Sequence, residues 1–429
     1  MGTMNYFKWM IAVAGLLYTG QILAQGGTVY EDRILDDKIK SVQMYIGNQP
    51  AMIPIIGFNS GFRKFTLRFD ELSDDANEFF YRVIHCDRNW KASDLEEIEY
   101  LDGYNGEEIQ DYQFSTNTYV DYVHFSLTLP NEDTRFRISG NYILIIYDDE
   151  QMTNPVITRR FIVNEDKAEV RSKFIHVNDV SLSQTHQQLA VEANIKDMRV
   201  GDLMNELSIN IYQNSRWDVG VANQKPKFVV KDKIRFDNTG QLAIPAGKEY
   251  RIFDTRSLQS TTTFVKSIDL HDVGSDVILV PGRKNVIRSD VDFDGRFVVY
   301  NFDTPYEDEF NIRSDYSNVI FGLESFELLD EVYLLGPFNN WQIDQDYKMK
   351  YADGQGYYVG TLLKQGVYNY LYATKDVDGK ADYTILEGDD HRTVNYYTTV
   401  LYYRDFTDQY DRVLATDKII YSDQFVDYR

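Results

Sequence analysis

The sequence predicts an all-β protein built from tandem immunoglobulin-like β-sandwich domains. Two observations support this fold class. Apolar and polar residues alternate with a period of two in many segments, and turn signals separate these segments at intervals of about 8–12 residues. The 33 Tyr and 25 Phe of the 429-residue chain supply enough aromatic surface for several hydrophobic cores.

The N-terminal third contains four clear strand patterns. Residues 64–70 and 122–129 alternate strictly, whereas 142–147 (YILIIY) is a continuous apolar run that is typical of a buried strand. Residues 156–163 follow a turn at Asn154-Pro155. The charged stretch 165–173 then marks a first domain boundary.

The remaining chain repeats this pattern, so we predict three consecutive domains: 25–165, 166–320 and 321–429. Further expected strands are 79–86, 189–195, 207–212, 227–236, 277–280, 332–335, 356–362, 367–373 and 393–403. The single predicted helix, of one or two turns, lies in 93–100, where Ser93 and Glu96 have the spacing of a capping box.

Residues 1–24 have the pattern of a secretory signal peptide that is cleaved after Ala24. Lys8 precedes an apolar stretch from Trp9 to Tyr18, which is about half the roughly 20 residues that span a bilayer. A membrane anchor is the alternative that this short stretch disfavours. No Cys stands directly after the cleavage site, where Gln25 follows Ala24, so no direct lipid anchor is expected.

The composition excludes several classes of partner. The chain has 67 acidic and 44 basic residues and a formal charge of -23. Nucleic acids and anionic lipid surfaces bind clustered Lys and Arg, so neither is an expected partner. The single Cys excludes an intrachain disulfide framework.

Catalytic motifs are missing from the sequence. None of the six His has a partner at the His-Glu-x-x-His spacing, and neither a G-x-S-x-G elbow nor a phosphate-binding Gly loop is present. Carboxylates are too abundant for counting to exclude a glycosidase pair. We therefore predict no enzymatic activity, no catalytic residue and no cofactor.

One acidic segment resembles the start of a calcium loop. Asp290, Asp292 and Asp294 have the required spacing, but the twelfth position holds Asn301 instead of the bidentate Glu. A turn between two strands at Asp294-Gly295 explains the segment without a metal. We predict no metal site here, although the sequence leaves calcium binding open.

The adjacent His85 and Cys86 could suggest a thiol–imidazole pair. They end the predicted strand 79–86, however, where neighbouring side chains point to opposite faces. Cys86 shares its face with Phe80 and Ile84. A buried structural thiol is the favoured interpretation.

The stretch VYLLGPFNNW (332–341), with the strands that follow it, resembles early-set immunoglobulin-like domains such as glycogen-binding modules. In the sugar-binding members the Trp that matches Trp341 stacks on a glucose ring. A second stacking Trp follows a D-G turn, but here Ala381 stands after Asp378-Gly379. We therefore expect Trp341 to pack against its own sandwich.

Several longer segments resemble the plug-protein family of the type IX secretion system. They are HCDRNWKASDLEEIEYLDGYN (85–105), LPNEDTRFRISGNYILIIYDD (129–149), YRIFDTRSL (250–258), DVDFDGRFVVYNF (290–302), LLGPFNNW (334–341) and EGDDHRTVNYYTTVLYYRDFTDQYDRVL (387–414). The resemblance implies a periplasmic protein that closes the periplasmic opening of a large outer-membrane β-barrel translocon. That barrel is the implied partner.

Two functions from different classes follow from these patterns. The first is a non-enzymatic plug, with the loop from Asp87 to Asp111 and its Trp90, Tyr100 and Tyr104 as the candidate contact with the barrel. A loop that packs on its own sandwich is the alternative for these three residues. The second function is an exported carbohydrate-binding protein. Secreted cargo would carry its own sorting domain, for which the C-terminal strand region leaves no room, so the plug is preferred.

Overall fold

The computed structural model describes residues 30–421, with gaps at 59–60, 62, 196–197, 199, 231–232, 237–239, 263, 287, 289–291 and 307–308. The predicted signal peptide and Asp290 lie outside the described residues. Among the residues within these ranges, no helix is both long and apolar enough to cross a membrane.

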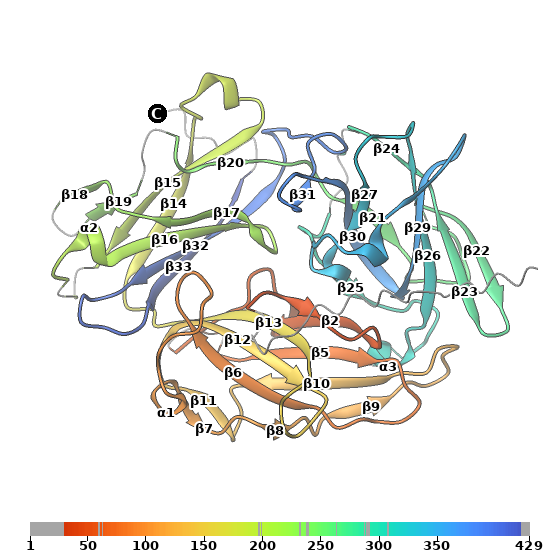
Figure 1. Ribbon diagram of the computed structural model, residues 1–429, viewed down its shortest axis with the longest axis horizontal. Coiled ribbons are helices and arrows are strands. Elements are labelled where there is room, and N and C mark those ends of the chain that lie inside the picture. Colours follow the sequence, from red (N-terminus) through yellow and green to blue (C-terminus); the bar gives the residue numbers. More distant parts are fainter. Residues whose placement is uncertain are drawn as a thin grey trace, which may run out of the picture.

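The first sandwich occupies residues 30–165 and consists of two main sheets (Figure 1). One sheet has the order β1-β13-β12-β6-β8 with β4 beside β13, the other has the order β3-β2-β5-β10-β9, and β7 pairs with β11. Its elements are β1 (Arg33–Ile34), β2 (Ile39–Ile46), β3 (Gln49–Pro50), β4 (Ile55–Gly57), β5 (Phe65–Glu71), β6 (Phe80–Cys86), α1 (Glu97–Tyr100), β7 (Leu101–Gly103), β8 (Glu107–Glu108), β9 (Tyr112–Phe114), β10 (Val123–Leu129), β11 (Thr134–Phe136), β12 (Gly140–Tyr147) and β13 (Pro155–Asn164).

The alternation that predicted these strands places one face of each sheet in a common core. Phe69 of β5 stacks on Phe125 of β10 with ring centroids 5.1 Å apart, and Phe79 meets Phe69 edge to face. The continuous apolar run of β12 is buried along its whole length. Its second face packs outside the sandwich, against the middle domain, which explains why the run does not alternate.

The middle sandwich is assembled from two distant parts of the chain. Strand β16 pairs in register with β32, so that Leu207 lies opposite Tyr403. The elements are β14 (Glu169–Ile175), β15 (His186–Asn194), α2 (Leu203–Glu206), β16 (Leu207–Gln213), β17 (Arg216–Gln224), β18 (Phe228–Val230), β19 (Lys233–Arg235), β20 (Ala243–Pro245), β32 (Asn395–Tyr403) and β33 (Arg412–Tyr421). One sheet has the order β14-β15-β19-β18 with β20 beside β15, and the other has the order β17-β16-β32-β33.

The third sandwich lies in the chain between β20 and β32. Its elements are β21 (Arg251–Asp254), β22 (Val265–His271), β23 (Gly274–Leu279), β24 (Gly282–Arg283), β25 (Phe297–Val299), α3 (Phe310–Arg313), β26 (Tyr316–Glu324), β27 (Val332–Leu335), β28 (Lys350–Ala352), β29 (Gly356–Lys364), β30 (Gly366–Lys375) and β31 (Ala381–Asp382). Strand β30 pairs with β21, β25, β27 and β31, and the facing sheet has the order β22-β23-β26-β29-β28 with β24 beside β26.

The strand pairing therefore departs from the predicted consecutive division at 320/321. Residues 251–299 belong to the third sandwich, and the C-terminal strands return to the middle one. The alternation of side chains is a local signal and does not specify which distant strand completes a sheet. The nested arrangement follows from pairing between β16 and β32, which the local pattern could not reveal.

The all-β fold class is confirmed. The predicted strands appear within a few residues of their expected ends, and the predicted helix is the single turn α1. The expected strand 227–236 is instead a hairpin of β18 and β19. The third sandwich also buries Tyr368 and Tyr372, whose hydroxyls donate to the carbonyls of Lys364 and Gly322 instead of reaching water.

The three sandwiches lie around a common centre (Figure 1), and buried polar contacts join them. Between the first and third sandwiches, the Lys364 ammonium donates to the carboxylate of Asp70 at 2.5 Å. Between the first and middle sandwiches, the Arg412 guanidinium donates twice to Glu165, at 2.7 and 2.6 Å. Burial alone would raise the pKa of Glu165, but hydrogen bonds with Arg412, Lys167 and Ser139, together with the Arg412 charge, lower this pKa to about 2.

Candidate functional site

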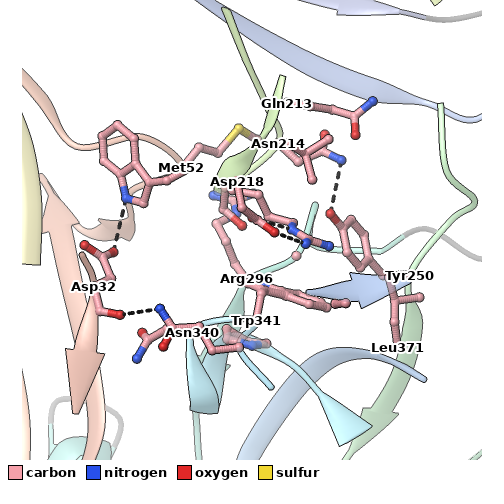
Figure 2. Close-up of a pocket in the computed structure, with 18 of the residues that line it drawn as sticks. Asp32, Met52, Gln213, Asn214, Asp218, Tyr250, Arg296, Asn340, Trp341 and Leu371 are labelled. Atoms are coloured by element: carbon pink, nitrogen blue, oxygen red, sulfur yellow. Dashed lines mark hydrogen bonds and ion pairs between the residues drawn. The ribbon is translucent and has the colours of Figure 1, made fainter. Parts of the chain in front are cut away.

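A cavity of about 820 Å³ lies where the three sandwiches meet (Figure 2). The first sandwich contributes β1, the β2–β3 hairpin and β13, and the middle sandwich contributes β17 and the loop 245–248. The third sandwich contributes β25, the loop after β27, β30 and β31. Because no single sandwich forms this cavity, its shape depends on how all three are packed together.

Aromatic side chains form the part of the wall that belongs to the third sandwich. Trp341 is buried, and its ring lies 5.1 Å from that of Tyr250. The Arg216 guanidinium of β17 lies over the rings of Trp341 and Tyr383, at 4.9 and 4.8 Å from their centroids. Arg216 is also paired with Asp218. This guanidinium joins the middle sandwich to the third by cation–π contacts.

The backbone after β27 fixes the position of Trp341. Gly336 starts a short 3₁₀ turn at Pro337–Asn339, and its N–H donates to the Asn339 side chain at 2.9 Å. Asn340 and Trp341 then adopt left-handed conformations, with φ of 55° and 61°. The Trp341 N–H donates to the Gly336 carbonyl at 3.0 Å, which closes the loop over the cavity.

Asp32 connects the first sandwich to both others (Figure 2). Its carboxylate accepts the indole N–H of Trp217 at 3.1 Å, and its backbone carbonyl accepts the side-chain amide of Gln342 at 3.0 Å. The second carboxylate oxygen accepts the backbone N–H of Arg160 at 2.7 Å. All of these groups lie on the cavity wall.

The cavity wall carries more positive than negative side chains. Seven Lys and Arg residues line it against five Asp and Glu residues, whereas the whole chain has 44 against 67. Arg159 is the most deeply buried of the unpaired cations, with 4% of its surface exposed. Among the lining residues that the structure describes there is no His or Cys, so the wall offers no imidazole base or thiol nucleophile.

The acidic segment of the possible calcium loop lies beside this cavity and forms a turn. Asp292 accepts the N–H groups of Tyr250 and Asp294, at 2.6 and 2.7 Å. Gly295 has a φ of +81°, as expected for a turn. Within the described ranges, no group of three or more His, Cys, Asp or Glu side chains is placed to hold a metal ion. Asp290 lies outside those ranges.

Glu249 makes the stability of this region depend on pH. Burial, together with the carboxylates of Asp292 and Asp294, raises the pKa of Glu249 to about 7, although the Val394 N–H opposes the shift. An unfolded Glu has a pKa of about 4.3, so the folded chain holds this proton more tightly. The stabilisation from protonated Glu249 is complete below about pH 4.3, the unfolded pKa, and is lost as the pH rises to about 7. We expect Glu249→Gln to melt above wild type at pH 8 and close to it at pH 4.5, and identical pH profiles would contradict this.

His85 and Cys86 do not form a catalytic pair. The His85 ring lies in the first sandwich and donates to the Ser139 carbonyl at 3.2 Å, and burial lowers its pKa to about 4. Cys86 points the other way, into a cluster with Trp90, Ile143 and residues of the middle sandwich. Burial raises the pKa of its thiol to about 12. Cys86 is therefore an unreactive buried thiol.

The buried thiol gives a direct test of this packing. We expect the folded chain to resist modification by a water-soluble disulfide reagent and to react with it fully after unfolding, because Cys86 is the chain's one thiol. Cys86→Ala should cost about 1 kcal/mol of unfolding free energy through lost packing. Rapid modification of the native chain would show that this interface opens.

The three residues of the predicted contact loop separate in the structure. Trp90 is buried between the first and middle sandwiches, edge to face with Trp217 at 4.9 Å. Tyr100 is buried in the first core. Only Tyr104 is exposed, with 74% of its surface accessible. Because both rings are buried, Trp90 and Tyr100 do not form a contact surface. The sequence pattern did not reveal this burial, since it does not indicate which sandwich covers each ring.

No motif in the sequence points to Arg159, Asp32 or Arg216. The one available signal is the Arg pair inside the apolar strand VITRRFIV, where a charge requires either solvent or a buried acceptor. A cavity formed by three sandwiches has no signature in local sequence.

Comparison with known proteins identifies the first sandwich. Residues 39–165 match the family described as "Type 9 secretion system plug protein 1st domain". A hypothetical protein from Parabacteroides merdae ATCC 43184 is 28% identical, with a TM-score of 0.86 over 92% of this chain and 100% of that chain. This similarity covers all three sandwiches. No curated protein matches the chain.

Two other solved structures are much less similar. The BSP domain of a biofilm associated protein is 7% identical, with a TM-score of 0.18 over 93% of this chain and 62% of that one. The dimeric latent PorU of Porphyromonas gingivalis is 10% identical, with a TM-score of 0.15 over 89% and 34%. These scores are too low to indicate a common fold. Residues 39–165, by contrast, match a domain family of type IX secretion system plug proteins, which supports that family for this chain.

Proposed function

We propose that this chain is a non-enzymatic periplasmic plug, which closes the periplasmic opening of an outer-membrane β-barrel translocon of the type IX secretion system. The observation that carries the proposal is the family match of residues 39–165. The predicted signal peptide would deliver the chain to the periplasm. The barrel is the proposed partner.

A plug must resist deformation, and the packing between sandwiches supports such a role. Tyr402 of the middle sandwich donates to Asn141 of the first at 2.9 Å, in a fully buried contact. The Tyr316 hydroxyl of the third sandwich donates to Asp70 of the first at 2.6 Å. Buried hydrogen-bonded contacts of this kind hold domains in one relative orientation.

We place the contact with the barrel on the exposed part of the predicted loop. Tyr104 projects its ring into solvent, while its backbone is fixed by Asp133 and Thr134 at 3.0 and 2.9 Å. Ile98 of α1 is also exposed, and Glu97 of the same turn accepts the N–H of Asn105 at 3.3 Å. Apolar side chains on a fixed backbone provide contact surface at a low entropic cost.

Purification of the native outer-membrane complex tests the proposal. Wild type should co-elute with a large barrel, and Ile98→Ser combined with Tyr104→Ser should reduce the co-eluting fraction at least tenfold, which corresponds to about 1.4 kcal/mol. Val180→Ser, an exposed apolar residue of the middle sandwich, is the matched control. Absence of a barrel beside wild type would disprove the plug function. Normal recovery of the double variant would disprove only this contact surface.

The carbohydrate-binding alternative is not supported by the position of Trp341. A sugar platform requires an exposed ring, whereas this ring is covered by Tyr250 and Arg216. Ala381 also lacks the second stacking surface.

A further inference from the structure

We propose that the cavity between the three sandwiches binds a ligand with a carboxylate and an apolar body, and that Arg159 receives the carboxylate. This site is separate from the proposed contact with the barrel. The carboxylate could belong to a free organic acid or to the C-terminus of a polypeptide, because both present the same chemistry.

The first observation is that Arg159 lacks an anionic partner. Its Nη1 donates to the carbonyls of Arg33 and Thr158, at 3.0 and 2.8 Å. Its Nη2 is buried and has no hydrogen-bond partner among the described residues. A buried guanidinium normally pairs with a carboxylate, since burying an uncompensated charge is costly.

The Asp32 carboxylate acts on Arg159 electrostatically, but both of its oxygens already accept other hydrogen bonds. Asp32 uses one oxygen to accept the Arg160 backbone N–H, and it uses the other to accept the Trp217 indole N–H. Both of these bonds hold the cavity wall together. Arg159 therefore has no anion of its own, and a ligand carboxylate that displaces the packing over its Nη2 would gain a charge-assisted hydrogen bond.

The surroundings favour an anion with an apolar body. The lining has an excess of cations in a chain that is otherwise strongly acidic. Met44, Met52, Ile343 and Leu371 line the same cavity together with Trp341, which supplies surface for an apolar group. The volume of about 820 Å³ lies within the roughly 300–1,000 Å³ that is usual for small-ligand sites.

Binding at this site would link the ligand to the packing of the sandwiches. Arg159 belongs to the first sandwich, and Trp341 and Leu371 belong to the third. A ligand that contacts both sandwiches would stabilise the arrangement in which they are packed together, because it would bind that arrangement more tightly than one in which they are apart.

Calorimetric titration of the purified chain tests the inference with defined probes. The probes are 3-phenylpropionate and N-acetyl-leucyl-phenylalanine, each paired with its neutral amide. We expect at least one acid to bind with a Kd of about 1 mM or tighter, and its amide to bind at least tenfold more weakly. Binding of the dipeptide acid alone would identify a polypeptide C-terminus, and binding of phenylpropionate as well would identify a free organic acid.

Two variants assign the binding to the cavity. Arg159→Gln should weaken the acid at least tenfold and leave the amide unchanged, whereas Arg135→Gln, on an exposed part of β11, should have no effect. Ala51→Trp places a large side chain on the cavity wall at the β3–β4 loop and should weaken binding while Arg159 is retained. The proposal is wrong if neither acid binds to wild type, if acid and amide bind equally, or if binding survives in both folded variants.

Discussion

Replacing Lys364 with Met is expected to destabilise the chain by about 3–5 kcal/mol, because it leaves Asp70 buried without its counter-charge. Both side chains are inaccessible to solvent, and the ammonium donates to the carboxylate at 2.5 Å. The ammonium also lies 3.9 Å from the centre of the Tyr122 ring. Since Asp70 is on β5 and Lys364 is on β29, loss of this ion pair should weaken the packing of the first sandwich against the third.

Thermal and denaturant unfolding measure this effect. Lys375→Met is the matched control, because Lys375 pairs with Glu331 at the surface, and such pairs contribute less than about 1 kcal/mol. The double variant Asp70→Asn and Lys364→Met should recover part of the loss, since it removes both charges. A Lys364→Met chain as stable as the control would show that the Asp70–Lys364 pair does not stabilise the contact between the first and third sandwiches.

The same pair predicts sensitivity to acid. Burial alone would raise the pKa of Asp70, but the Lys364 ammonium and the hydrogen bond with His124 outweigh it and hold the pKa below its ordinary value. The unfolded chain therefore binds this proton more readily than the folded one. The stabilisation is present above about pH 4 and is lost as the pH falls through the lower, folded-state pKa. Unfolding measured from pH 6 to pH 2 should show a smaller loss of stability in the double variant than in wild type.

Trp341→Ala is expected to cost about 3–5 kcal/mol, because it removes a large buried ring. The loss includes contacts with Tyr250 and the cation–π contact with Arg216, which belongs to the middle sandwich. The melting temperature of Trp341→Ala should fall clearly below that of the control Tyr358→Ala. Tyr358 is a half-exposed residue of the same sandwich.

A glucan pull-down with the same variants separates the structural role of Trp341 from sugar binding. We expect neither wild type nor Trp341→Ala to bind glucan. A stable Trp341→Ala chain, beside a wild type that retains glucan, would contradict both the packing role and the absence of sugar binding.

The sequence by itself determined the fold class and the positions of many of the strands, although β2, β26 and β33 were not predicted. The period-two alternation of β5 and β10 requires only that one face of each strand be buried, so local residues suffice to identify it. The burial of Cys86 was also predictable, because it shares its strand face with the apolar Phe80 and Ile84. The burial of Trp341 was predictable because Ala381 stands where sugar-binding domains have a second stacking Trp. The resemblance carried by the segments 85–105 and 129–149 pointed to the plug-protein family, whose first-domain model matches residues 39–165.

The tertiary structure alone decided how distant segments meet. Strands β16 and β32 are separated by the whole third sandwich, and local alternation carries no information about such a pairing. For the same reason Trp90 was expected in a contact loop, although the middle sandwich covers it. The cavity beside Arg159 exists only because three sandwiches pack at one point, and that packing depends on contacts between residues far apart in the chain.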